Sequence, residues 1–248
     1  EDAPMHFNLV VKKTSDVHEK ILQQQMKEAD ELKGRLDEFF LAMRAFRNDF
    51  RSSAPFNFTG SVQDAYAKMN SYAKTLDEKT TEAANFNELE ELFEMTVSRY
   101  PEVGDTKSEL SQLKMLWDFK GMIEYTYDFW RSEKWNLIDT ETRCMENEQL
   151  KKLHKQLGND FPMIKGWNVY RDIEADIKQM QVVLPLVTDL HEEAMRRRHW
   201  QALAKVCGVK AINPDDPGFT MGNVWALKLD EHVDDVSDIV ETAMKELK

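Results

Sequence analysis

Three arginines occupy positions 196–198 of this 248-residue chain, directly before His199 and Trp200. Such a cluster could perform acid–base chemistry through the histidine, bind a polyanion through its guanidinium groups, or join helices by ion pairs. Because three adjacent residues span about 200° of a helix circumference, at least one arginine should border the packed face. There its stem can pack while its guanidinium pairs with a carboxylate or a helix C-terminus. The pattern favours a joint in which Arg198 and Trp200 fix one helix against its neighbours, with a polyanion or partner-docking patch as the alternative.

The sequence contains none of the motifs that most often carry catalysis or bind a cofactor. No glycine precedes a lysine and no two glycines stand five apart, so there is no phosphate-binding loop. No two histidines stand four apart, as a helical metal site requires. Cys144 and Cys207 lack a neighbouring histidine, which favours structural thiols over nucleophiles. We therefore assign no catalytic, cofactor-binding or metal-binding residue and predict that this segment is not an enzyme.

Composition and charge limit the class of protein further. Hydrophobic residues make up 42% of the chain, with only 9 glycines and 7 prolines, which is typical of a helix-rich globular protein. A net charge of −12 argues against nucleic acid as a partner. The absence of an 18-residue apolar run predicts no membrane span, and two distant cysteines favour a reducing compartment. The chain begins without methionine and its last residues keep a helical pattern, so we expect a piece of a longer protein.

Apolar residues at spacings of three and four predict an all-α protein. The first helix is expected to start at Ser15 or Asp16 and to end before Pro55, and a second is expected to begin at Ser61. The first helix carries one apolar seam: Leu32, Leu36, Phe39, Met43, Phe46 and Phe50. A third helix over residues 86–97 should end before Pro101, and a fourth should cover residues 110–130.

The second half of the chain shows the same periodicity. A fifth helix is expected from Asp139 to Gly158, with Met145, Leu150, Leu153 and Leu157 on its apolar face and the glycine as a left-handed end. Helices are also expected over residues 167–180, over residues 185–207 starting at a turn with Pro185 and closed by Gly208, and over residues 233–243. Residues 213–223 read as a loop, and residues 210–214 and 225–229 could each form a short strand.

One order of segments resembles the tail-to-linker region of dynein heavy chains. Trp167 precedes the helix VYRDIEADIKQMQVVLPLVTDL, and MRRRHWQAL, PGFTMGNVWAL and EHVDDVSDIV follow it. Arg198, His199 and Trp200 match the Arg-His-Trp of that family, and Phe219 and Thr220 match a Phe-Thr-Leu step, with Met221 in place of leucine. The segments ELFEMTVSRYPEV and LWDFKGMIEYTYDFWRSEKWNLID are also similar, so the likeness covers about residues 75–248.

The resemblance implies helical bundles in series, with a tail bundle over residues 1–140 and the C-terminal tail and N-terminal linker over residues 141–248. It implies a force-transmitting and assembly segment of a ciliary or flagellar outer-arm motor, between the docking tail and the linker of the AAA+ ring. ATP and Mg²⁺ would bind elsewhere in the heavy chain. The implied partners are other heavy chains, intermediate and light chains, and docking or regulatory proteins of the axoneme, in the cytoplasm and cytoskeleton, with no nucleic acid and no membrane. The alternative is a free-standing helical scaffold that binds other proteins.

Overall fold

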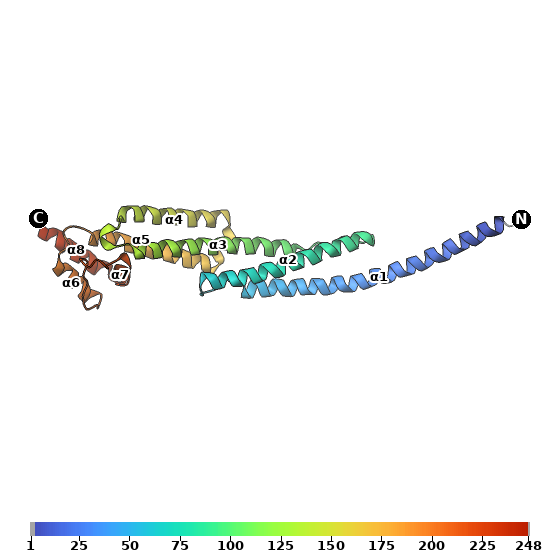
Figure 1. Cartoon of the computed structure of the whole chain (residues 1–248), viewed down its shortest axis with the longest axis horizontal. Coiled ribbons are helices and arrows are strands. Elements are labelled where there is room, and N and C mark those ends of the chain that lie inside the picture. The colour runs from blue at the N-terminus through green and yellow to red at the C-terminus, as the bar shows by residue number, and fades with distance from the viewer. Residues whose placement is uncertain (1–2, 248) are drawn as a thin grey trace. The chain divides into compact units, whose positions relative to one another are not determined.

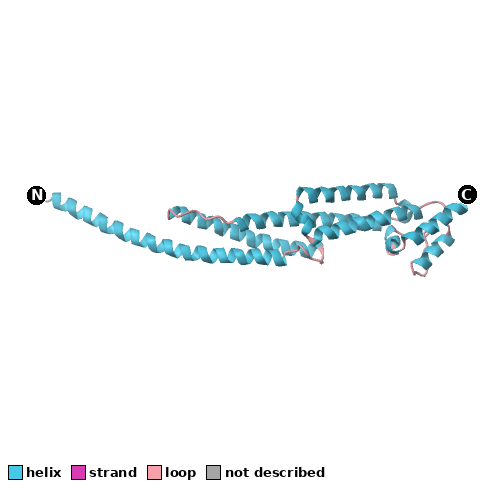
Figure 2. Ribbon diagram, turned by 180° about the vertical axis from the view of Figure 1, so that it is seen from behind, coloured by secondary structure: helices cyan, strands magenta, loops and turns pink. Residues whose placement is uncertain are grey.

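The computed structural model describes residues 3–247, and their side chains from residue 6 onward. Helices make up most of this part of the chain, and Figure 2 shows no strand in it. The α-helices are α1 Ala3–Ser53, α2 Val62–Leu92, α3 Pro101–Ser132, α4 Thr140–Asp160, α5 Asn168–Leu190, α6 Arg197–Val206, α7 Met221–Trp225 and α8 Val233–Leu247 (Figure 1). Short 3-10 helices occupy Trp135–Leu137, Pro162–Gly166 and Leu229–Glu231. The all-α prediction is confirmed, and the two short strands expected near residues 210 and 225 do not form.

The chain divides into two compact units. Unit 1 contains residues 1–54 and 67–111, and unit 2 contains residues 55–66 and 112–248. The division of tail from linker at residue 140, which the resemblance implies, is a different boundary and stays a prediction. Over residues 3–247, no helix combines the length and the apolar character that crossing a membrane requires.

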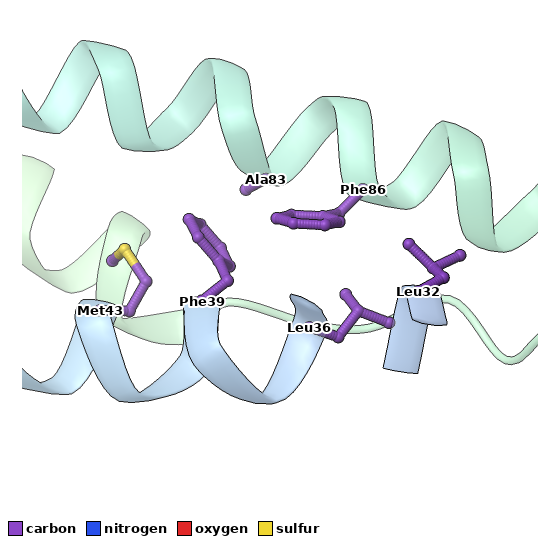
Figure 3. Packing of buried hydrophobic residues seen from close by; sticks show 6 residues of the cluster. All are labelled: Leu32, Leu36, Phe39, Met43, Ala83 and Phe86. Carbon is purple, nitrogen blue, oxygen red and sulfur yellow. The ribbon is translucent and has the colours of Figure 1, made fainter. Parts of the chain in front are cut away.

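In unit 1 the predicted seam of α1 forms the core. Leu32, Leu36, Phe39 and Met43 are buried and face Phe86 and Ala83 of α2 (Figure 3). The Phe39 ring lies 5.1 Å from the Phe86 ring and 5.2 Å from the Tyr100 ring, between centroids. Next to this seam, Arg47 binds both carboxylate oxygens of Glu109, at 2.9 and 2.6 Å. A paired guanidinium can be buried there because its charge is matched.

Helix boundaries in the first half differ from the sequence expectations at three places. α1 is helical from Ala3, not from Ser15 or Asp16, because its one early helix breaker, Pro4, falls in the first turn where proline is tolerated. α2 is one helix through Leu92, where two were expected, since no glycine or proline interrupts it. It also ends at Leu92 and not at residue 97, and residues 95–100 are irregular. Pro101 begins α3 instead of only ending the preceding helix, which is the preferred position of a helical proline.

The expected start of α2 at Ser61 is confirmed. The Asp64 amide donates to Ser61 Oγ at 3.1 Å, and Ser61 Oγ donates to Asp64 Oδ2 at 2.7 Å. This reciprocal arrangement satisfies an amide that the first turn of a helix leaves unpaired.

In unit 2, α4 packs along α5, and the apolar face expected for α4 is only partly confirmed. Leu150 is buried and Leu157 is half-buried, but Met145 and Leu153 are exposed. The residues that α4 buries are instead spaced three and four apart and are mostly polar or small: Asn147, Leu150, His154 and Gly158. Asn147 accepts from the Tyr127 hydroxyl at 2.7 Å, and His154 Nε2 lies 3.0 Å from the Tyr170 carbonyl oxygen. Hydrogen bonding to neighbouring elements makes their burial possible.

Glycine and proline in unit 2 also behave differently from the expectation. Asp139 caps α4 as expected, accepting from the Thr142 amide at 3.0 Å. Gly158, however, is not a left-handed helix end: it lies inside α4, where an added Cβ would overlap the Tyr170 hydroxyl. Pro185 lies inside α5, on its exposed side, instead of opening a new turn. Gly208 does adopt the left-handed conformation, with φ of 68°.

Candidate functional site

The Arg-His-Trp cluster lies at the start of a helix, not within one. α5 stops at Leu190, a turn covers residues 191–196, and α6 then starts at Arg197. The expectation of one helix from Pro185 to Cys207 is therefore wrong. The three arginines are exposed, whereas His199 and Trp200 are buried at about 5% and 3% exposure. The amphipathic start of α6 thus presents two side chains to the core and the guanidinium groups to the surface.

The Trp200 ring packs against two other aromatic rings, those of Trp135 and Phe219. We name these three residues the aromatic joint. The Trp200 ring centroid lies 5.6 Å from that of Trp135 and 6.2 Å from that of Phe219, with edge-to-face angles of 87° and 85°. The Trp135 and Phe219 rings are 5.9 Å apart. Edge-to-face pairs are favourable beyond their buried area because a positive ring edge meets a negative face. The joint connects three segments that are distant in sequence.

Backbone hydrogen bonds reinforce the aromatic joint. The Trp135 amide donates to the Phe219 carbonyl at 3.0 Å, and the Met221 amide donates to the Glu133 carbonyl at 2.9 Å. Lys134 and Thr220 form an antiparallel bridge between these bonds. These two segments of the chain approach so closely that a Cβ on Gly222 would lie 2.9 Å from the Arg131 carbonyl oxygen. The segment after α3 is therefore fastened to the segment that leads into α7.

Thr220 precedes α7, so the last three residues of the expected loop 213–223 are helical instead. The Thr220 amide donates to Asn223 Oδ1 at 2.8 Å, and the Thr220 hydroxyl donates to the same oxygen at 3.1 Å. Met221, at the position where the related family usually has leucine, is fully buried. A flexible thioether fills an apolar site of this size with little penalty.

Arg198 and His199 converge on one carboxylate oxygen of α8. Arg198 Nε donates to Glu246 Oε2 at 2.8 Å, and its Nη2 binds the same oxygen. The Arg196 amide donates to His199 Nδ1 at 3.1 Å, so the ring proton is on Nε2, which lies 2.9 Å from Glu246 Oε2. The Arg198 guanidinium, with a smaller contribution from His199, holds the pKa of the Glu246 carboxyl below its usual range. These bonds fasten the start of α6 to the end of α8.

The other two arginines have different surroundings. Arg197 Nε lies 4.0 Å from Asp215 Oδ2, with both side chains largely exposed. Arg196 precedes α6, and its carbonyl accepts from the amides of His199 and Trp200 at 2.8 and 3.3 Å. Two of the three guanidinium groups thus face carboxylates of the same chain. This arrangement fits the ion-paired joint better than the polyanion patch.

Three further residues of the site, His191, Trp135 and Glu246, were not predicted from the sequence to join helices. His191 Nε2 lies 2.7 Å from the Trp135 carbonyl oxygen, and the two rings are 5.0 Å apart. Trp135 itself lies in a short 3-10 helix, where helical periodicity gives no signal. Glu246 belongs to an acidic helix whose carboxylates look alike in the sequence. Only their contacts in the folded structure identify these three residues as part of the site.

Trp167 lies apart from the cluster formed by the other motif residues. It precedes α5, and its ring is 4.7 Å from that of Phe56. The aromatic joint lies beyond the other end of the same helix, next to His191. A 23-residue helix is about 34 Å long. The motif residues therefore mark both ends of α5 instead of one site.

The charged groups of this part of unit 2 contact one another across neighbouring elements. Between residues 3 and 247, no three His, Cys, Asp or Glu side chains are grouped so as to hold a metal ion. A cavity of about 390 Å³ in unit 2 is lined partly by Lys120, Arg131, Asp176 and Trp225. Lys120 Nζ lies 4.0 Å from Asp176, whose pKa burial raises, and the Arg131 guanidinium stacks 4.1 Å from the Trp225 ring centroid. These charged groups interact with one another, which is typical of a structural cluster.

Comparison with known proteins gives a consistent result. Residues 103–248 match the family model of the dynein heavy chain, N-terminal region 2. The whole chain aligns at 31% identity with the dynein beta chain of the flagellar outer arm from Chlamydomonas reinhardtii, covering 6% of that protein. Ninety per cent of the chain aligns at 29% identity with the alpha chain of the same outer arm, and all of it aligns at 27% with dynein axonemal heavy chain 11 of Sus scrofa. It covers 5% of each of these two.

The chain thus spans about one-twentieth of the length of these relatives. The family model covers more than half of it and includes the aromatic joint and all of α4–α8. The chain therefore belongs to the dynein heavy chain family.

Proposed function

We propose that this chain is a non-catalytic, force-transmitting and assembly segment of an axonemal dynein heavy chain, between the docking tail and the linker of the AAA+ ring. ATP and Mg²⁺ act elsewhere in the heavy chain. Its partners are other heavy chains, intermediate and light chains, and docking or regulatory proteins of the axoneme, and it needs neither nucleic acid nor a membrane. The names of the relatives, which include flagellar outer-arm and axonemal chains, support a location in the cilium or flagellum.

The observation that carries this proposal is the way unit 2 fastens helices that are distant in sequence. The aromatic joint connects the segment after α3 to α6 and to the segment before α7, and Glu246 connects α6 to α8. Close-packed interiors have low compressibility, so a displacement applied to one of these elements is passed to the others. A segment built in this way suits the transfer of motion that is generated elsewhere.

The test is to loosen the aromatic joint in the intact heavy chain without removing its apolar character. Trp200→Phe keeps a buried ring but shortens the edge that meets Trp135 and Phe219. We expect microtubule gliding to slow while the ATPase rate per heavy chain stays unchanged, because motion is lost between the ring and the tail. The exposed Arg197→Ala provides the matched control and should change neither quantity.

Two other outcomes would decide against the proposal. If Trp200→Phe lowered the gliding velocity and the ATPase rate by the same factor, the segment would act in the catalytic cycle. Unchanged gliding together with loss of subunits from the purified arm would favour the helical-scaffold alternative.

A further inference from the structure

Residues 6–31 of α1 form a helical stretch whose side chains are almost all exposed. Residues 6–31 are exposed apart from partly buried Ala29, whereas the next turn begins the buried seam at Leu32. In Figure 1 the N-terminal part of α1 runs beyond the turn that links α2 to α3 in the same unit. This part of the helix carries apolar side chains that are each at least 50% exposed, among them Phe7, Val10, Val17 and Ile21. We name these four residues the N-terminal stripe.

The N-terminal stripe lies on the same face of α1 as the buried seam of unit 1. Its members are separated by 3, 7 and 4 residues, and Leu32 follows Ile21 after 11 residues, or about three turns at 3.6 residues per turn. Farther along, this face packs against Phe86 and Ala83 of α2 (Figure 3). This face thus carries two apolar stretches, separated by Gln25 and Glu28, of which the second is covered by a helix and the first is exposed.

A row of lysines borders the stripe on one side. Lys13, Lys20 and Lys27 stand seven residues apart, so they line up along the helix next to the apolar positions. Lys27 is 3.6 Å from Glu31, while Lys13 and Lys20 have no ion pair with any residue that the structure describes. The border of the stripe is therefore positively charged, although the whole chain carries a charge of −12.

We infer that the N-terminal stripe docks an amphipathic helix of another polypeptide segment, with an apolar stripe of its own and Asp or Glu at seven-residue spacing beside it. The apolar positions match those that already receive α2 in unit 1, and acidic flanks would pair with Lys13 and Lys20. This docking surface is independent of the proposed force-transmitting role.

The flanking residues argue against a second copy of this chain as the occupant. In a parallel pair, Lys13 and Lys20 would face His18 and Gln25 of the other copy, and neither of these is acidic. In an antiparallel pair the lysine rows would face each other and repel. An acidic helix satisfies both the apolar and the charged parts of the surface.

The experiment uses the 248-residue chain and two synthetic 28-residue helical peptides. Both peptides carry leucine at the stripe positions, and their flanking positions are all glutamate in one and all lysine in the other. We expect fluorescence anisotropy to show the glutamate peptide binding about tenfold or more tightly than the lysine peptide. The double variant Val17→Asp, Ile21→Asp should lose this binding, whereas Lys12→Gln, on the opposite face, should keep it. Circular dichroism checks that both variants retain the native fold.

Several results would overturn the inference. Equal binding of the two peptides, or binding that survives the double variant, would remove the assigned surface. A dimer of the chain in analytical ultracentrifugation that Ile21→Asp dissociates would also contradict it. So would a chain that binds phosphatidylserine vesicles through the stripe but binds neither peptide. In the intact dynein arm, zero-length carbodiimide coupling should join Lys13 or Lys20 to an acidic residue of a helix. Coupling only to another copy of residues 1–31 would contradict the inference.

Discussion

Unit 1 and unit 2 hold their helices together by different means. The core of unit 1 is a seam repeated along α1, in which Leu32, Leu36 and Phe39 follow one another at helical spacing. The core at the C-terminal side of unit 2 depends on single large side chains, above all Trp135 and Trp200, and on backbone bonds between irregular segments. A repeated seam spreads its stabilisation over many similar contacts, whereas a joint concentrates it at a few.

The two units bury polar groups of different charge. In unit 1, Arg47 binds Glu109 with two hydrogen bonds, and Glu90 accepts hydrogen bonds from the amide and the hydroxyl of Ser98. Unit 2 buries neutral groups between α4 and its neighbours, namely Asn147 and His154, each bonded to another element. In both units, therefore, hydrogen bonds between particular residues add to the apolar contacts, and these residues are charged in unit 1 and neutral in unit 2.

The largest effect is expected at the aromatic joint. Trp200→Ala removes a ring that is 3% exposed and packs against Trp135 and Phe219, and should lower the free energy of unfolding by about 3–5 kcal/mol. Urea unfolding followed by near-UV circular dichroism measures the loss. The exposed neighbour Arg197→Ala should change it little. An unchanged midpoint for Trp200→Ala would show that the joint does not concentrate stability.

A smaller effect is expected in the seam. Leu36→Ala, at 6% exposure, should cost about 2–4 kcal/mol, because the seam can close partly around the cavity that is left. Leu41→Ala on the same helix is the matched control, since Leu41 is 67% exposed. Hydrogen exchange should show faster amide exchange in residues 32–50 for Leu36→Ala alone. If Leu36→Ala costs more than Trp200→Ala, the contrast between seam and joint is wrong.

The sequence predicted the seam well because periodicity is a property of the helix itself. Leu32 to Phe50 were placed on one face, and Ser61 and Asp139 were recognised as helix starts from their local hydrogen-bonding capacity. Boundaries failed where a residue has two permitted roles. Pro101 can end one helix or begin the next, and only the packing of α3 decides between them.

The joint was predicted only in part. Arg198 and Trp200 were assigned to a helix joint, but their partners Glu246 and Trp135 were not identified, because nothing in the sequence relates positions so far apart. The face of α4 was misjudged for a related reason. Hydropathy favours Met145 and Leu153 over Asn147 and His154, and only the hydrogen-bond partners on other elements make the polar pair the buried one.

A local cap should matter less than either core. Ser61→Ala removes the side-chain acceptor of the Asp64 amide and should lower the free energy of unfolding by about 1 kcal/mol. Ser71→Ala, at an exposed position within the same helix, is the control and should have a smaller effect or none. Urea unfolding of the two variants side by side measures the difference. A loss for Ser61→Ala as large as that of Leu36→Ala would mean that the start of α2 has a role beyond capping.

The smallest effect vanishes at neutral pH and concerns the buried neutral histidine of unit 2. Burial lowers the pKa of His154, opposed in part by its bond to the Tyr170 carbonyl and by Glu174 and reinforced by Lys178. The folded chain therefore binds a proton less readily than the unfolded chain, whose histidine pKa is about 6.5. The free energy of unfolding should therefore be highest above about pH 6.5 as far as His154 is concerned. It should fall as the pH drops below about 6.5 and level off below the lowered pKa of His154 in the folded state.

Urea midpoints measured between pH 8 and pH 5 should show this slope for the native chain. In His154→Gln the contribution of this group is absent, so the slope over the same interval should be shallower. His6→Gln is the control, because the His6 side chain is exposed on α1. If the slope survives unchanged in His154→Gln, the acid sensitivity does not arise at the interface between α4 and α5. A slope that becomes shallower in His154→Gln alone would assign it to this one buried histidine, and would show that a single neutral group between two helices makes their packing depend on pH.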